Sequence, residues 1–179
     1  MKTVATFILN RILGWKVENG FPKAPKKYII IAAPHTSWMD FPIAILARVS
    51  EGTMVHFIGK GSLFKFPLGY FFRALGGTPV DRSKSNKLVD AVIDLFNSKE
   101  EFRLALSPEG TRKKVTAWKT GFYYIAKGAN VPVVMAAFDF ENKKLKVSAP
   151  YDITGDLEKD FEHFNLFYKN IKGRNPELS

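Results

Sequence analysis

The chain of 179 residues contains no cysteine. Disulfide bonds and zinc sites built from thiolates are therefore excluded. Covalent catalysis through a thiol is excluded as well, so any group transfer on this chain would proceed without a cysteine intermediate. Histidine is scarce too, with three residues, and each histidine position is therefore informative.

Long hydrophobic runs are also missing. No run approaches the ~20 apolar residues that cross a bilayer as a helix. Residues 2–13 are rich in apolar side chains, but Asn10 and Arg11 interrupt them and no small-residue cleavage site follows. We expect neither a signal peptide nor a membrane-spanning helix.

Acidic residues are few relative to basic ones. Seventeen Asp and Glu face 27 Lys and Arg, which gives a formal net charge of +10. Such an excess favours an anionic partner, whether nucleic acid, an anionic membrane surface or a phosphorylated substrate. The lysine pairs are scattered and no nucleic-acid-binding motif accompanies them. We therefore expect no nucleic acid partner, and a basic nucleic-acid-binding module is kept only as an alternative.

Apolar periodicity divides the chain into alternating helices and strands. Helices are expected at 1–16, where the pattern is amphipathic, at 40–49, from 85 onward, at 118–127 and at 157–171. Strands are expected at 28–33, 53–58, 78–80, 102–106, 131–138 and 144–148, with loop and short helix over 59–77. This alternation predicts an α/β fold with a mostly parallel, mixed sheet of about six or seven strands flanked by helices. No linker or repeat is present, so one domain over residues 1–179 is expected.

His35 and Asp40 lie five positions apart, directly after the first expected strand. In one regular helix such positions lie about 140° apart around the axis, so their side chains would not meet. They meet if His35 lies in the turn between strand and helix and Asp40 in the first helical turns. Pro34 keeps its predecessor extended, and Thr36 or Ser37 is a natural N-cap. Asp40 would then orient the imidazole and leave its other nitrogen as a base.

A structural role for this pair is the alternative. His35 would then be a surface turn residue and Asp40 an ordinary helix-start residue. The other two histidines are weaker candidates, because His56 falls inside an expected strand and His163 on the polar side of the last helix.

A second group of polar residues follows the expected strand at 102–106. Glu109 offers an acceptor for a substrate hydroxyl, Arg112 a bidentate donor for phosphate, and Thr111 a further donor beside Gly110. Ligands of open α/β sheets bind at this end of the strands. The alternative is a Pro-Glu-Gly turn with a surface ion pair.

Two further basic residues, Lys60 and Arg82, lie close to glycines, which allow close backbone approach. Lys60 is not part of a P-loop, because Gly61 stands where that motif requires Ser or Thr. No group of histidines and carboxylates has metal-ligand spacing, so we predict no metal site. A base with an orienting carboxylate, together with anion-binding turns, indicates a hydroxyl activated next to a phosphate, as acyl transfer would require.

Several stretches, taken in order, resemble the motifs of the glycerolipid acyltransferases, the family typified by 1-acylglycerol-3-phosphate acyltransferase. His35–Asp40 matches the family's H-x4-D motif. The others are Gly59–Gly69, Gly77–Arg82, Ser107–Arg112 with its Glu-Gly-Thr-Arg block, and the proline-containing Val131–Val134. Ser107 departs from the pattern, since the family commonly has phenylalanine there, and this could alter the acceptor pocket.

The resemblance implies an O-acyltransferase with a glycerol-phosphate acyltransferase-like fold. It implies transfer of a fatty acyl group from acyl-CoA or acyl carrier protein to the free hydroxyl of a lysophospholipid, foremost 1-acylglycerol-3-phosphate, with no separate cofactor. The roles it implies are His35 as general base, Asp40 as its orienting partner, Glu109 as the residue that positions the glycerol, and Arg82 and Arg112, with Lys60, as phosphate ligands.

Other functions stay open. The same mechanism would serve a different lyso-lipid, such as an amino-acid lipid, because arginine binds carboxylate as well as phosphate. A non-catalytic lipid-binding module is a further alternative. The helix at 1–16 suits a peripheral position on the cytoplasmic face of a membrane, with its apolar face in the interface and its basic residues near anionic headgroups. Alternatively, this helix packs on the domain.

Overall fold

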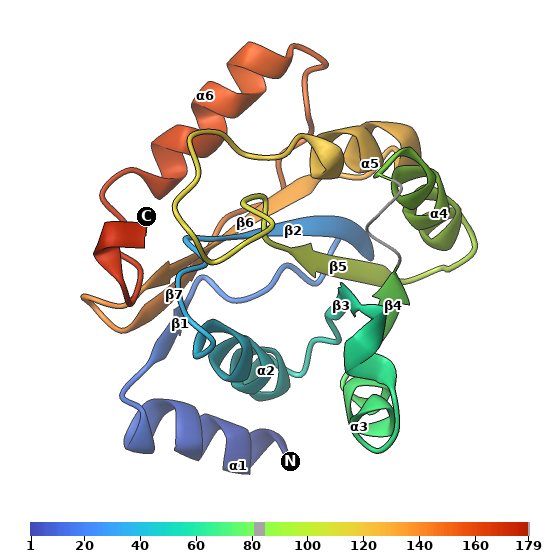
Figure 1. Ribbon diagram of the computed structural model, residues 1–179. Coiled ribbons are helices and arrows are strands. Elements are labelled where there is room, and N and C mark those ends of the chain that lie inside the picture. The colour runs from blue at the N-terminus through green and yellow to red at the C-terminus, as the bar shows by residue number, and fades with distance from the viewer. Residues whose placement is uncertain (81–84, 179) are drawn as a thin grey trace.

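The computed structural model describes residues 1–80 and 85–178, apart from the side chains of residues 60, 80 and 85–87. Seven strands form one sheet in the order β1-β7-β6-β2-β5-β3-β4 (Figure 1). Five neighbouring strands, from β6 to β4, run parallel, whereas β7 is antiparallel to β6 and carries β1 parallel to itself. The strands are β1 Lys16–Glu18, β2 Lys27–Ala33, β3 His56–Lys60, β4 Gly77–Val80, β5 Phe102–Leu106, β6 Val133–Asp139 and β7 Lys144–Val147.

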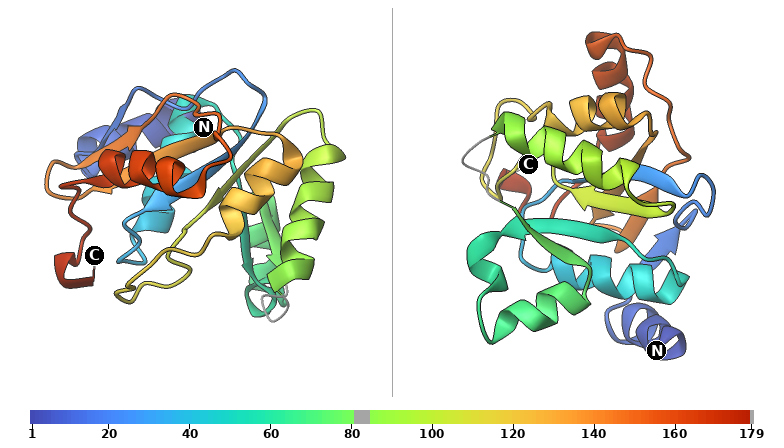
Figure 2. Two further views of the ribbon diagram at one scale, coloured as in Figure 1. Left: turned by 90° about the horizontal axis from the view of Figure 1, so that it is seen from above. Right: turned by 90° about the vertical axis from the view of Figure 1, so that its right-hand side faces the viewer.

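Helices cover both faces of the sheet (Figures 1 and 2). One face carries α4, α5 and α6, and the other carries α1, α2 and α3. In the described residues the α-helices are α1 Lys2–Phe7, α2 Asp40–Glu51, α3 Leu68–Ala74, α4 Ser85–Asn97, α5 Gly121–Ala129 and α6 Leu157–Tyr168. Short helical turns are η1 Ile8–Ile12, of the π type, and the 3₁₀ turns η2 Gly61–Phe64 and η3 Pro176–Leu178. The predicted fold class is therefore confirmed.

The two faces of the sheet hold two separate hydrophobic cores. Ile29 and Ile31 of β2 belong to the core beneath α4, α5 and α6, whereas Tyr28 and Ile30 belong to the core beneath α1 and α2. Successive side chains of a strand point to opposite faces, so a strand covered on both sides is apolar throughout. Each such fully buried side chain contributes about 1.5–3 kcal/mol. The two cores hold β2 rigidly, and β2 leads directly into the turn that carries His35.

Several element boundaries differ from the sequence expectations. The helix expected from residue 118 begins at Gly121, and the strand expected from residue 131 begins at Val133. The strand expected from residue 53 begins at His56, because Thr53 N–H donates to Arg48 O in the C-terminal cap of α2. The helix expected to stop at Gly128 continues to Ala129, and Asn130, with φ of 50°, takes the left-handed cap. Gly128 serves packing instead, since a Cβ there would lie 2.4 Å from Ile93 Cδ1. The last helix ends at Tyr168 instead of residue 171.

The N-terminal segment is the largest departure. The helix expected over 1–16 is an α-helix that passes into a π turn and ends at Ile12, and strand β1 follows at Lys16–Glu18. A strand of three residues gives too short a pattern to detect by periodicity. Ala5 and Leu9 are buried on the α2 side, so one face of this helix does pack on the domain. Within residues 1–80 and 85–178, no helix is long and apolar enough to span a membrane.

Candidate active site

The candidate residues follow the carboxyl ends of adjacent parallel strands. β2 ends at Ala33, two residues before His35, and its neighbour β5 ends at Leu106, three residues before Glu109. β3 and β4 continue the same parallel arrangement and end at residues 60 and 80. The side chain of Lys60 and the whole of Arg82 lie outside the described residues. The carboxyl ends of these four strands therefore lie at one edge of the sheet, where open α/β sheets bind ligands.

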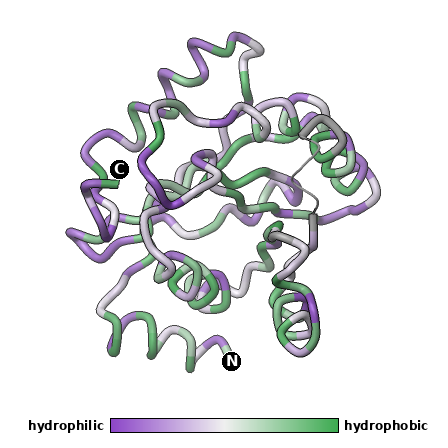
Figure 3. Tube along the Cα trace, viewed as in Figure 1, coloured by the Kyte–Doolittle hydropathy of each residue, from purple (hydrophilic) through white to green (hydrophobic). Residues whose placement is uncertain are grey.

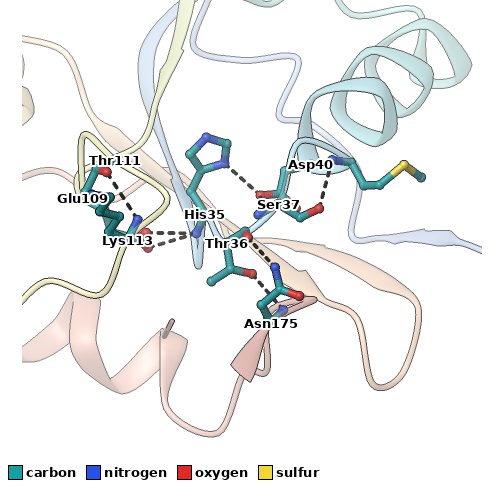
Figure 4. A network of polar contacts seen from close by, with 9 residues as sticks. His35, Thr36, Ser37, Asp40, Glu109, Thr111, Lys113 and Asn175 are labelled. Atoms are coloured by element: carbon teal, nitrogen blue, oxygen red, sulfur yellow. Dashed lines mark hydrogen bonds and ion pairs between the residues drawn. The ribbon is translucent and has the colours of Figure 1, made fainter. Parts of the chain in front are cut away.

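His35 and Asp40 contact each other at this edge. His35 Nδ1 lies 2.8 Å from Asp40 Oδ2 (Figure 4). His35 lies in the turn after β2 and Asp40 is the first residue of α2, which is the arrangement that the spacing required. The Asp40 side chain is 2% exposed, whereas the His35 side chain is 30% exposed. The carboxylate is thus buried in the protein, and the imidazole reaches from it toward solvent.

The N-cap of α2 differs from the expectation. Met39 takes that position, and neither Thr36 nor Ser37 provides a side-chain cap. Instead, Ser37 Oγ accepts from Met39 N–H at 3.2 Å, and Ser37 N–H donates to Asp40 Oδ2 at 3.1 Å. Asp40 is therefore held by the backbone of the turn as well as by His35, which fixes the carboxylate and the imidazole relative to each other.

Glu109 lies on the other side of His35. Both of its carboxylate oxygens accept from the backbone N–H of His35, at 3.0 and 3.1 Å. The Glu109 side chain is buried, and this burial raises the pKa of its carboxyl, while the His35 N–H bond lowers it in part. Sequence reasoning assigned Glu109 to a substrate hydroxyl and missed this link to the histidine turn. The link also rules out the alternative in which Glu109 forms a surface ion pair.

The rest of this turn is more open. Gly110 has φ of 68°, and a Cβ there would lie 3.0 Å from the Lys119 side chain, so glycine suits the position on both counts. Thr111 Oγ1 accepts from Lys113 N–H at 3.3 Å. Arg112 is exposed, and no salt bridge joins it to another described residue. Its guanidinium is therefore open to an anion from solvent, on the turn that also carries the buried Glu109.

Asn175, in the segment after α6, also contacts the turn that carries His35. Asn175 Nδ2 donates to Thr36 O at 2.9 Å, and Asn175 N–H donates to Thr36 Oγ1 at 3.2 Å (Figure 4). Thr36 is the residue after His35. Sequence reasoning missed Asn175, because it lies in an irregular segment that no periodicity or motif marks.

The remaining histidines lie in other surroundings. His56 is half-buried in β3 beside Phe102, and burial lowers the pKa of its imidazole. His163 is exposed on α6 and stacks on Tyr151 with ring centroids 4.1 Å apart. In the part of the chain that the structure describes, no three His, Asp or Glu side chains are placed to hold a metal ion.

Comparisons with known proteins bear on the family and the fold of the chain. The sequence model of the Acyltransferase family matches residues 16–139, which is well over half of the chain and includes His35, Asp40 and Glu109. No curated protein matches the chain. In structure the chain is similar to the 1-acyl-sn-glycerophosphate (LPA) acyltransferase PlsC from Thermotoga maritima, with a TM-score of 0.64, 22% identity, and coverage of 93% of this chain and 76% of that one. The structural likeness supports the fold, and on the sequence match the chain belongs to the Acyltransferase family.

Proposed function

We propose that this acyltransferase moves a fatty acyl group from acyl-CoA or acyl carrier protein to the free hydroxyl of a lysophospholipid, foremost 1-acylglycerol-3-phosphate. The observation that carries the proposal is the 2.8 Å contact between His35 Nδ1 and Asp40 Oδ2, with the imidazole partly exposed. A buried carboxylate that orients a partly exposed histidine is an arrangement for general-base catalysis.

The proposed reaction uses His35 as the base. Asp40 accepts a hydrogen bond from Nδ1–H, so the lone pair of the imidazole is on Nε2. Nε2 takes the proton of the acceptor hydroxyl as its oxygen bonds to the thioester carbonyl carbon. The carbon–sulfur bond then breaks, and the leaving thiolate receives the proton from the imidazolium. Transfer is direct, in keeping with the absence of cysteine from the sequence.

The proposed acceptor carries a phosphate, and Arg112 is the described residue best suited to it. This arginine is exposed on the turn that also carries Glu109, and Glu109 contacts the His35 backbone. A ligand of Arg112 would therefore lie near the base. Arg82 and Lys60 remain proposed phosphate ligands on sequence grounds. The net charge of +10 favours an anionic acceptor and an anionic donor alike.

We also propose an anionic membrane surface as the partner that supplies the acceptor. Exposed apolar side chains gather on the N-terminal helix and on η2–α3, and Phe66 is 86% exposed. Hydrophobic residues predominate along both segments of the trace in Figure 3. Both segments lie below the sheet in Figure 1 and in the right view of Figure 2. These side chains are Val4, Phe7 and Ile12 in the first segment and Leu63, Phe66, Leu68, Tyr70 and Phe71 in the second.

The charge of these two segments also favours contact with an anionic membrane. Residues 1–17 contain three basic residues and no acidic one, and residues 52–80 likewise contain basic residues and no acidic one. Apolar side chains beside basic ones suit a peripheral position in the headgroup region of an anionic leaflet, such as the cytoplasmic face of a membrane.

The acceptor is tested by an assay with a panel of lipids. The protein is given labelled acyl-CoA or acyl carrier protein together with lysophosphatidic acid, other lysophospholipids or an N-acyl amino acid. Product from lysophosphatidic acid supports the proposal. Product from the N-acyl amino acid alone would move Arg112 to a carboxylate partner, because arginine binds both anions with the same geometry.

A further inference from the structure

The last segment of the chain crosses from the sheet to the candidate active site. It follows α6 and lies beyond residues 16–139, the part that matches the family. Phe140 N–H donates to Lys172 O at 3.0 Å, and Lys172 Nζ lies 2.6 Å from Glu141 Oε1. These contacts fix the start of the segment beside the β6–β7 connection. Asn175 follows three residues later and contacts Thr36.

Asn175 binds Thr36 at two points. Its side-chain Nδ2 donates to the Thr36 carbonyl at 2.9 Å, and its backbone N–H donates to Thr36 Oγ1 at 3.2 Å. Two bonds to one residue restrict its rotation as well as its position. Thr36 is 2% exposed, so loss of the Nδ2 donor would leave its carbonyl poorly compensated by water.

The turn that carries His35 is thus anchored on both sides. Glu109 accepts from the N–H of His35, and Asn175 donates to the carbonyl of Thr36, the next residue (Figure 4). Asp40 then orients the imidazole itself. With the backbone held at two neighbouring residues, His35 has little freedom apart from its own side-chain torsions.

We propose that Asn175 is a positioning residue for the catalytic turn, acting through Thr36 on His35. Its effect on rate rests on the proposed function, because it acts on the base of that reaction. A displacement of the base by a fraction of an ångström lowers the rate of the chemical step more than it lowers substrate affinity. The alternative is that Asn175 only ties down the C-terminus and has no influence on His35.

Two substitutions separate these roles. Asn175→Ala removes the Nδ2 donor and the side-chain volume. Asn175→Asp keeps the volume and the backbone N–H but places an acceptor oxygen opposite the Thr36 carbonyl. Positioning requires the donor, so both variants should be impaired, whereas a space-filling role would tolerate Asn175→Asp. Asn165→Ala is the matched control, because Asn165 is exposed on α6.

The experiment measures kcat and KM together with amide hydrogen exchange at residues 35–37. For both Asn175 variants we expect kcat to fall by about tenfold with KM within about twofold, and exchange at these amides to accelerate. The Asn165→Ala protein should match the wild type in every measurement. A melting temperature close to that of wild type confirms that the variants are folded.

Kinetics and exchange keep the two proposals apart. If the wild type transfers acyl groups, wild-type kcat in Asn175→Ala or Asn175→Asp overturns the positioning role, as does a loss confined to KM. If the wild type transfers no acyl group to any acceptor, the proposed function fails, and exchange alone decides on Asn175. Faster exchange at residues 35–37 then supports its role as an anchor of the turn, and unchanged exchange overturns it.

Discussion

The carboxylate of Glu109 accepts from the backbone N–H of His35 at 3.0 and 3.1 Å, although the two residues are 74 positions apart. The contact follows from the topology, because β2 and β5 are parallel neighbours and each leads into its turn at the same edge. A buried carboxylate therefore connects the turn that carries His35 to the turn that carries Arg112. Disturbing Glu109 should affect the base even if Glu109 never touches the substrate.

The raised pKa of Glu109 predicts how activity depends on pH. Because burial raises this pKa, the carboxylate takes up a proton at a higher pH than an ordinary glutamate and then binds His35 N–H more weakly. Activity should thus fall on acidification, because a protonated Glu109 holds the turn that carries His35 less firmly. Glu109→Gln stays neutral, so its kcat/KM at neutral pH should be lower by about tenfold and its acid limb shallower. If the activity of wild type and of Glu109→Gln fell equally steeply at acidic pH, the Glu109 contact with His35 N–H would not influence the base.

Arg112 should determine affinity for the acceptor. In Arg112→Ala we expect KM for a phosphorylated acceptor to rise by about tenfold with kcat little changed, because a charge-assisted bidentate contact is lost. Arg112→Lys should restore part of the affinity, since lysine supplies charge without the fork geometry. Lys113→Ala, at an exposed neighbour, is the control. An unchanged KM in Arg112→Ala would remove this arginine from the phosphate site.

A buried acid away from the site should set the stability of the fold at both ends of the pH scale. Asp160 is fully buried and accepts from Tyr123 Oη at 2.9 Å, from Tyr151 Oη at 2.8 Å and from Thr154 N–H. Burial alone would raise the pKa of Asp160, but bonds from Thr154 and the two tyrosines lower it overall. Burial, assisted by Asp160, raises the pKa of Tyr123 and Tyr151 to about 12.

The directions of these pKa shifts determine the pH range over which each group stabilises the fold. Asp160 contributes its full stabilisation of the fold above the ordinary aspartate pKa of about 3.9. This stabilisation is lost as the pH falls through the lowered pKa of Asp160 in the folded protein. The tyrosine contribution is full below about pH 10 and is lost as pH rises toward 12. Asp160→Asn should lower the free energy of unfolding by about 3 kcal/mol near neutral pH and flatten both limbs. Glu162→Gln, an exposed change on the same helix, should do neither in denaturant titrations.

Membrane binding should depend on both exposed apolar segments, the N-terminal helix and η2–α3. Phe7→Ser and Phe66→Ser each remove an exposed aromatic side chain, and each should weaken flotation with anionic vesicles, with the double variant weakest. Leu166→Ser is the control, because Leu166 is 69% exposed but lies on α6, on the other face of the sheet. Binding of the double variant equal to that of wild type would exclude this surface as the membrane contact.

The sequence predicted the contact in the site that joins residues close to each other in the chain. His35 and Asp40 are close in sequence, and a proline before a turn and a helix after it were enough to infer their contact. The mostly parallel sheet followed from strands alternating with helices, because such a chain can bury its strands in few other ways.

The remaining contacts could not be inferred, because nothing local specifies them. Glu109 reaches the His35 backbone and Asn175 reaches Thr36 across 74 and 139 positions, and a backbone partner leaves no trace in sequence pattern. The end of the helix expected at residue 127 was wrong for a related reason, because Gly128 lies inside α5. This glycine resembled a helix stop, whereas its missing side chain makes room for Ile93 of α4.

The most direct test of the central claim is acyl transfer by His35→Ala compared with wild type. With labelled acyl-CoA or acyl carrier protein and lysophosphatidic acid, the wild type should form product, and the folded variant should lose about 10²–10⁴-fold in rate, the usual contribution of a general base. A His35→Ala protein that retains the wild-type rate would contradict the assignment of His35 as the base.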